Sequence, residues 1–180
     1  MRYSATTARP VASLTAVSLL TKCVFLLLPL VAAASDDKVD RATLRGIKGM
    51  CTVVEVLDQT KESSVGLSQE KLQSDIQGKL QQAGLVIEKD STNCLYFSVR
   101  PLAAIGKNNR PIGLYAVDFK LEFLQAVTLA RDPSVRAYAP TWSVSNLANV
   151  PADDVERTAR EVAADLVSRF VRAYRGVNSK

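Results

Sequence analysis

The chain has 180 residues, of which 47% are hydrophobic and 23% charged, and its formal net charge is +5. It contains no histidine, which is the commonest general base, the usual partner of a catalytic serine and the commonest metal ligand. The composition therefore excludes Ser/His and Cys/His mechanisms and predicts neither a metal site nor another cofactor.

Residues 1–34 have the layout of a secretory signal peptide. Their only charges are Arg2, Arg9 and Lys22, and residues 24–34 (VFLLLPLVAAA) form an unbroken apolar run. This segment takes three of the 23 cations and none of the 18 acids, so its removal lowers the net charge to about +2. Such a small charge does not indicate nucleic-acid binding, which requires a concentrated basic surface.

Cleavage is predicted after Ala34, because Ala32 and Ala34 fit an A-x-A site, and Ser35 would begin the mature protein. We therefore expect a periplasmic or secreted protein. A retained membrane anchor is the alternative, but the apolar run is well short of the roughly 20 residues that span a bilayer. A lipoprotein is a further alternative, disfavoured because the bulky Lys22 precedes Cys23. Membrane contact is expected only through the uncleaved signal peptide.

Residues 35–45 are polar and are predicted to form a flexible leader, and residues 46–178 a single α+β domain. The domain opens with residues 46–49 (GIKG), whose two glycines suggest a loop that clamps phosphate or nucleic acid. Such loops work at a helix N-terminus or between two helices. Here the segment precedes the valine-rich residues 51–57 (CTVVEVL), so it is predicted to be a turn that enters a strand.

A helix is predicted after this first strand. Ser68 is a suitable N-cap and Gly84 a suitable stop. The apolar residues between them recur every four positions, at Leu72, Ile76 and Leu80. This spacing predicts one buried face.

A second strand is predicted over residues 94–99 (CLYFSV), and the intervening helix makes the first two strands parallel. Cys51 and Cys94 each open one of these strands, so both lie at the same end of the sheet. In an oxidising compartment this arrangement favours a disulfide between them. Two small buried thiols are the alternative.

The clearest strand pattern covers residues 114–129 (LYAVDFKLEFLQAVTL), where apolar side chains alternate with polar or small ones. Its length predicts a bend or bulge near Gln125. Residues 132–134 are predicted to turn the chain. Residues 137–146 (AYAPTWSVSN) are predicted to form a fourth strand, in which Pro140 indicates an edge position or a bulge.

Apolar residues at helical spacing predict a last helix between Pro151 and Gly176, with acids in its first turns and arginines in its last. The element order is then β-α-β-β-β-α. Both helices can cover one apolar face of a four-stranded mixed sheet, which gives a two-layer α+β sandwich.

Two features are candidate binding sites. Residues 106–110 form a basic hairpin tip in which Lys107 and Arg110 could meet phosphate or anionic lipid headgroups, and a solvated loop is the simpler interpretation. Tyr138 and Trp142 fall on one face of the fourth strand and could stack on a ligand. Packing of Trp142 beneath the last helix is the simpler interpretation there.

The acidic residues do not indicate an active site. Asp118 and Glu122 fall on the solvent face of a strand, Asp153 and Asp154 complement a helix N-terminus, and Glu55 is isolated within an apolar strand. A solvent-facing Glu55 is expected, because charged groups are seldom buried without a partner. The sequence assigns no catalytic residue, and we expect a protein that is not an enzyme.

Six segments carry a resemblance to known proteins: GIKG, TVVEVL, KLQQAG, CLYFSV, LQAVTLAR and TWSV. Over essentially the whole mature chain they resemble a group of exported bacterial proteins of unassigned function, which implies no catalytic or binding residues. In layout alone the chain is similar to small envelope lipoproteins, namely the lipopolysaccharide-assembly plug and the penicillin-binding-protein activators. Those proteins bind other proteins and catalyse nothing, and this chain departs from them because it lacks a lipobox.

The leading hypothesis is an exported, non-enzymatic domain that binds a protein partner in the bacterial envelope or outside the cell, through exposed sheet edges. A carrier of a small apolar ligand, with a pocket near Trp142, is the alternative. A histidine-free hydrolase built on carboxylates is the third hypothesis.

Overall fold

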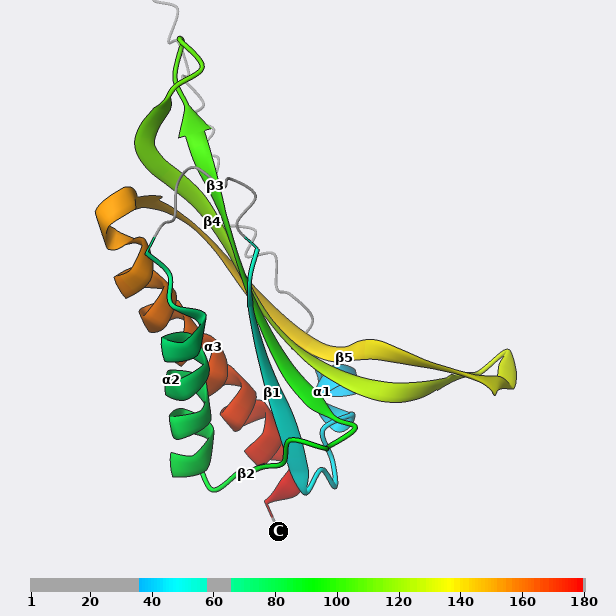
Figure 1. Cartoon of the computed structure of the whole chain (residues 1–180). Coiled ribbons are helices and arrows are strands. Elements are labelled where there is room, and N and C mark those ends of the chain that lie inside the picture. Colours follow the sequence, from blue (N-terminus) through cyan, green and yellow to red (C-terminus); the bar gives the residue numbers. More distant parts are fainter. Residues whose placement is uncertain (1–35, 58–65, 180) are drawn as a thin grey trace, which may run out of the picture. The chain divides into compact units, whose positions relative to one another are not determined.

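The computed structural model describes residues 36–57 and 66–179 (Figure 1). The predicted signal peptide and its cleavage site at Ala34 and Ser35 lie outside the described residues. In chain order, the elements are α1 Lys38–Ala42, β1 Gly49–Val56, α2 Gln69–Gln82, β2 Val86–Ile87, β3 Cys94–Ile105, β4 Pro111–Leu129, β5 Asp132–Pro151, the 3-10 turn η1 Ala152–Asp154, and α3 Val155–Asn178.

The strands form one mixed sheet in the order β2-β1-β3-β4-β5. β1 runs parallel to β2 and β3, and β4 runs antiparallel to β3 and β5. Figure 1 shows α2 and α3 together on one face of the sheet. The predicted α+β class is confirmed, but the sheet has five strands and not four. The additional strand β2 has two residues, too few to show a periodic pattern.

Helix α2 lies between the predicted cap and the predicted stop. The backbone N–H of Lys71 donates a hydrogen bond to Ser68 Oγ at 3.2 Å, and Gly84 follows the helix with a φ of +83°. The three residues of the predicted apolar face are buried: Leu72, Ile76 and Leu80. Contacts with β1 and with α3 fix this face against the sheet.

The core lies between the sheet and the two helices. Odd-numbered side chains of β4 enter it, as the alternation predicts, and the buried ones are Tyr115, Val117, Phe119, Leu121 and Phe123. The ring of Phe170 in α3 packs on Phe123 and Trp142, with centroid distances of 5.4 and 5.2 Å. These aromatic rings join α3 to both β4 and β5.

Helix α3 continues past its predicted end. The chain makes a 3-10 turn over residues 152–154, and the α-helix then runs to Asn178. Asn178 Nδ2 donates to the carbonyls of Tyr174 and Leu44, both at 2.9 Å. Because these bonds hold the last turn, the predicted stop at Gly176 was wrong.

Part of the predicted flexible leader is structured. The Asp37 side chain caps α1 by accepting hydrogen bonds from the N–H groups of Val39 and Asp40, at 2.7 and 2.9 Å. Leu44, just after α1, is fully buried. The sequence does not indicate this because α1 has five residues and a single apolar anchor follows it.

At one end of the sheet, β3 and β4 continue beyond their neighbours. The pairing of β1 with β3 ends at Val99, and the pairing of β5 with β4 ends at Leu114. We call residues 102–114 the β3–β4 arm. It ends in a hairpin whose tip includes Lys107 and Arg110, so the predicted location of this basic tip is confirmed. Figure 1 shows this hairpin at the top of the view.

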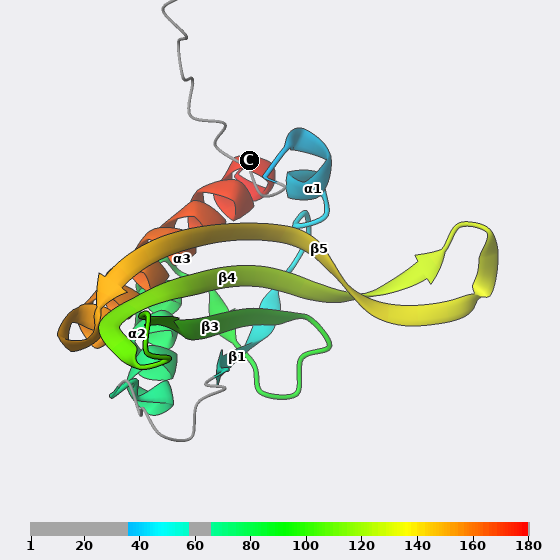
Figure 2. The ribbon, with the colours of Figure 1, turned by 90° about the horizontal axis from the view of Figure 1, so that it is seen from above.

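At the other end, β4 and β5 continue beyond the start of β3, where Cys94 pairs with Leu124. Within the described residues, 125–139 pair only with one another, and we call them the β4–β5 arm. Figures 1 and 2 show this ribbon running past the start of β3. The chain reverses at residues 130–131, so the turn predicted over residues 132–134 was wrong. Those three residues belong to β5, in which Asp132 pairs with Leu129 while Pro133 and Ser134 lie within a register irregularity.

Candidate functional site

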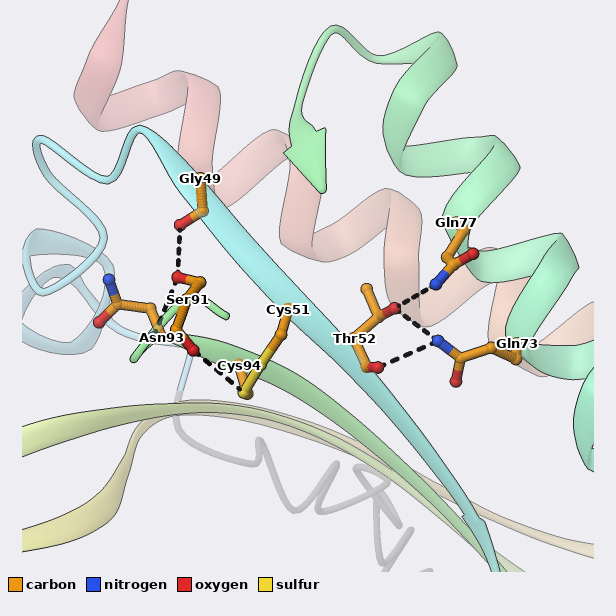
Figure 3. Close-up of a disulfide and its surroundings, with 8 residues drawn as sticks. All are labelled: Gly49, Cys51, Thr52, Gln73, Gln77, Ser91, Asn93 and Cys94. Atoms are coloured by element: carbon orange, nitrogen blue, oxygen red, sulfur yellow. Dashed lines mark hydrogen bonds between the residues drawn. A yellow bond between two sulfur atoms is a disulfide. The ribbon is translucent and has the colours of Figure 1, made fainter. Parts of the chain in front are cut away.

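The predicted disulfide between Cys51 and Cys94 is present (Figure 3). The two cysteines are register partners on parallel strands, with Cα atoms 4.5 Å apart. The N–H of Cys51 donates to the carbonyl of Asn93 at 2.8 Å, and Ser91 Oγ donates to the carbonyl of Gly49 at 3.3 Å. The covalent bond therefore fixes the entrance of β1 beside the entrance of β3.

The same strand is tied to helix α2 by two glutamines. Gln73 Nε2 donates to the carbonyl of Thr52 at 3.0 Å, and Gln77 Nε2 donates to Thr52 Oγ1 at 2.9 Å. Figure 3 shows both side chains reaching β1 from α2. These polar groups have a structural role and are not free for a ligand.

The GIKG segment is a turn that is bound to α3. Gly46 has a φ of +76°, and its N–H donates to Asn178 Oδ1 at 2.7 Å. Tyr174 Oη donates to the carbonyl of Ile47 at 2.7 Å. Since α3 engages these backbone groups, the segment does not present them to phosphate, and the prediction of a turn is confirmed.

Trp142 is a core residue and does not form an exposed stacking surface. Its side chain is 1% exposed and meets Phe170 of α3 edge-on, at an interplanar angle of 67°. The indole Nε1 donates to Asp36 Oδ1 at 2.9 Å. The predicted packing beneath the last helix is therefore confirmed, and a ligand pocket at Trp142 is not supported.

The carboxylate of Asp36 connects the leader to this core. Arg41 Nε and Nη2 each donate to it, at 2.7 Å. Burial raises the pKa of Asp36, but the hydrogen bonds from Arg41 and Trp142 and the positive charge of Arg41 outweigh it, so the pKa lies below its ordinary value. The charged carboxylate is the form that this site stabilises.

A groove of about 750 Å³ lies between α2 and α3. Three apolar side chains beneath it are at most 2% exposed, namely Ile76, Ala163 and Val167, and Ala164 beside them is half-buried. Lys71 Nζ pairs with Glu156 Oε1 at 3.0 Å, and Arg160 Nε pairs with Asp75 Oδ2 at 2.6 Å. The hydrogen bond and charge of Asp75 raise the pKa of Arg160. These ion pairs join the two helices across the groove.

The outer face of the sheet, opposite the helices, carries Tyr96 between carboxylates. Its hydroxyl donates to Glu55, which is solvent-exposed as predicted, and Glu122 lies opposite Tyr96 in the register of β4. Burial, the hydrogen bond and the two negative charges raise the pKa of Tyr96 to about 12, against the opposing charge of Arg100. The phenol therefore stays protonated near neutral pH and is unsuited to act as a base.

The part of the chain that the structure describes contains neither a candidate metal centre nor a candidate membrane-crossing helix. Residues 36–57 and 66–179 contain no cluster of three or more Cys, Asp or Glu side chains arranged to hold a metal ion. None of their helices combines the length and apolarity needed to cross a bilayer.

Tyr138 and Trp142 do not share a face of β5. Tyr138 pairs with Ala126 and Trp142 pairs with Phe123, because the register shifts between these pairs. In β4 an odd-numbered side chain such as Phe123 points inward and an even-numbered one points outward. The predicted common face was therefore wrong. One additional residue in a strand moves every side chain before it to the opposite face of the sheet.

The additional residue is Thr141, and it anchors the base of the β4–β5 arm. Gln125 Nε2 donates to Thr141 Oγ1 at 2.8 Å and to the carbonyl of Thr43 at 3.1 Å. Thr43 Oγ1 lies 3.3 Å from the carbonyl oxygen of Thr141. The bulge predicted near Gln125 is confirmed, and so is the edge position of the strand with Pro140.

The β4–β5 arm exposes apolar side chains on a ribbon that no third strand joins within the described residues. Tyr138 is 63% exposed and Val135 is 41% exposed. The charged residues near them in sequence are also exposed: Arg131, Asp132 and Arg136. This combination of a free strand edge and exposed apolar groups is the strongest candidate for a protein-binding site.

No family model matches the chain, and no curated protein matches it. Among solved structures, a variant of PelC from Paraburkholderia phytofirmans, solved as a dodecamer, has 14% identity and a TM-score of 0.37, over 73% of this chain and 88% of that one. Rare lipoprotein B from Shewanella oneidensis has 9% identity and a TM-score of 0.35, over 69% and 94%. A minor lipoprotein from Acinetobacter baumannii has 12% identity and a TM-score of 0.25, over 69% and 90%. Likeness at these scores carries no argument about function.

Proposed function

We propose that this protein is an exported, non-enzymatic domain that binds a protein partner in the envelope or outside the cell through the β4–β5 arm. The observation that carries the proposal is the exposure of Tyr138 and Val135 on a two-stranded ribbon beyond the rest of the sheet. Export is inferred from the signal-peptide layout of residues 1–34, and the disulfide is consistent with an oxidising compartment.

Two physical features make this ribbon suitable for a partner. The outer edge of β5 is a strand edge, which can accept an extended segment of another chain through backbone hydrogen bonds. Tyr138 supplies a large aromatic side chain of the kind that dominates the binding energy at protein interfaces. The bulge at Thr141 and its bonds to Gln125 hold the ribbon at its base, which lowers the entropy lost on binding.

The proposal is tested by site-specific photocrosslinking in cells that export the protein. A crosslinking amino acid in place of Tyr138 should give one dominant adduct with another protein. The same amino acid in place of Leu147, which is 72% exposed on β5 outside the arm, is the matched control and should give none. Mass spectrometry would identify the adduct, and an adduct with a second copy of this chain would assign the arm to self-association.

The substitution Tyr138→Ser should then abolish stoichiometric co-purification of the identified partner, whereas Leu147→Ser should preserve it. Equal adducts at both positions, or no adduct at Tyr138, would contradict the proposal.

A further inference from the structure

The β3–β4 arm combines exposed aliphatic side chains with unpaired cations. Ile112 and Ile105 are 61% and 53% exposed, and Leu102 and Leu114 are 46% and 37% exposed. These four residues flank a tip that contains Lys107 and Arg110. Together they form one amphiphilic element at one end of the sheet.

The arm is positively charged without compensation from its own strands. Lys107 and Arg110 are exposed and form no ion pair within the described residues. Residues 91–117 include these two cations and Arg100, and they contain no Asp or Glu. Within the arm's own residues an anionic surface would therefore meet only attraction, and the acids Asp153 and Asp154 follow the strand end that pairs with Leu114 at the base of the arm.

The hairpin is a defined structure and not an open loop. The N–H of Gly106 donates to the carbonyl of Arg110 at 2.9 Å, and the N–H of Asn109 donates to the carbonyl of Gly106 at 3.0 Å. Asn109 takes the left-handed conformation, with a φ of +56°, that a tight turn of this kind requires. Two backbone N–H groups of the tip are thus satisfied internally, which lowers the cost of placing it in a less polar medium.

We propose that the β3–β4 arm binds the surface of a bilayer that contains anionic phospholipids. Lys107 and Arg110 bind the headgroup phosphates, and the aliphatic side chains beside them enter the boundary between headgroups and acyl chains. This inference is independent of partner binding by the β4–β5 arm. It differs from the expectation that membrane contact is confined to the signal peptide.

The arm fits a membrane surface better than a protein interface. Protein interfaces are enriched in aromatic residues at their centre, whereas the exposed apolar residues of this arm are Ile and Leu. Basic residues next to aliphatic ones are the combination that adds electrostatic attraction to apolar insertion at anionic membranes. The arm contains both within a short hairpin.

The test is sedimentation of the protein, purified as cells export it, with vesicles of phosphatidylcholine that contain about one-third phosphatidylglycerol. The double variant Lys107→Gln/Arg110→Gln should bind roughly 25-fold more weakly, because each cation near an anionic surface contributes about fivefold. Ile112→Ser should weaken binding by about tenfold, since it removes one inserted aliphatic side chain.

The matched control is Arg45→Gln/Lys89→Gln. Both residues are exposed, and they precede β1 and β3 at the end of the sheet opposite the arm. This variant loses the same charge and should bind as tightly as the wild type. Circular dichroism should be the same for all variants, because every substituted residue is exposed.

The proposal is overturned if the wild type does not sediment with the anionic vesicles, or if it sediments equally with vesicles of phosphatidylcholine alone. It is also overturned if the two double variants bind alike. If light scattering instead reveals an oligomer that Lys107→Gln/Arg110→Gln dissociates, the arm is an interface between copies of this chain.

Discussion

Asp36 connects three parts of the protein through one carboxylate. It accepts hydrogen bonds from Arg41 of α1 and from Trp142 of β5, and Trp142 in turn packs on Phe170 of α3. A residue just beyond the predicted cleavage site is therefore linked to the aromatic core. The sequence does not indicate this role, because a single aspartate in a polar segment belongs to no periodic pattern or motif.

The substitution Asp36→Asn should lower the free energy of unfolding near pH 7 by about 1 kcal/mol. Hydrogen bonds to charged groups contribute about 1.5–3 kcal/mol, and partial solvent exposure reduces this value. Because folding lowers the pKa of Asp36, the stabilisation is present above its unfolded pKa of about 3.8 and is lost as the pH falls through the folded value.

Urea unfolding of the wild type and the variant, measured near pH 7 and near pH 3, checks this prediction. The difference in free energy should shrink at the lower pH. A difference that stays constant between the two pH values would show that the charge of Asp36 does not contribute.

At the scale of elements, the disulfide cross-links the only two long parallel strands in the described sheet. Cys51 and Cys94 are 43 residues apart in sequence and directly opposite each other in the register of β1 and β3. The crossover between the two strands contains α2, so the bond closes a βαβ unit. The cross-link mainly restricts the unfolded chain.

The double substitution Cys51→Ala/Cys94→Ala should lower the free energy of unfolding by about 3–4 kcal/mol, from the chain entropy of a loop of this length. A reducing agent should destabilise the wild type by a similar amount and leave the double variant unaffected. Denaturant unfolding with and without the reducing agent measures both effects. Two free thiols in the native wild type, found by mass spectrometry after alkylation, would contradict the disulfide itself.

The elements that the sequence predicts best are those with one buried face. The alternation in β4 identifies both the strand and the inward side chains, because Phe119 and its neighbours contact the core while Lys120 and its neighbours face water. The two arms extend the strands beyond their predicted bounds, since β3 runs past Val99 to Ile105 and β5 begins at Asp132, before Ala137. Most of their residues are exposed and none is fully buried, so burial imposes only a weak alternation on them.

The candidate sites show the same limit. The basic tip at Lys107 and Arg110 is predicted from its composition alone, and its location is confirmed. The prediction that Tyr138 and Trp142 share one face of the strand was wrong, because the bulge at Thr141 places them on opposite faces. This bulge has no distinctive sequence signal. Sequence patterns thus identify the tip of the β3–β4 arm but not the faces of the β4–β5 arm.

For the molecule as a whole, we predict that the exported form begins at Ser35. An A-x-A site at Ala32 and Ala34 follows an apolar run too short to span a bilayer. Edman degradation of the protein recovered from the periplasm or the medium checks this prediction. An intact Met1 would identify a retained anchor, and a protein found in the cytosol would contradict export.

Asn178, in the last turn of α3, donates to the carbonyl of Leu44 and accepts a hydrogen bond from the N–H of Gly46. Helix α1, which precedes these residues, also contacts α3, so the start of the folded domain and its end lie near each other. A short peptide could join them, and the chain could be opened at the exposed turn of residues 130–131 instead. Such a circular permutant would keep the order of the sheet while it places a fusion tag at the tip of the β4–β5 arm.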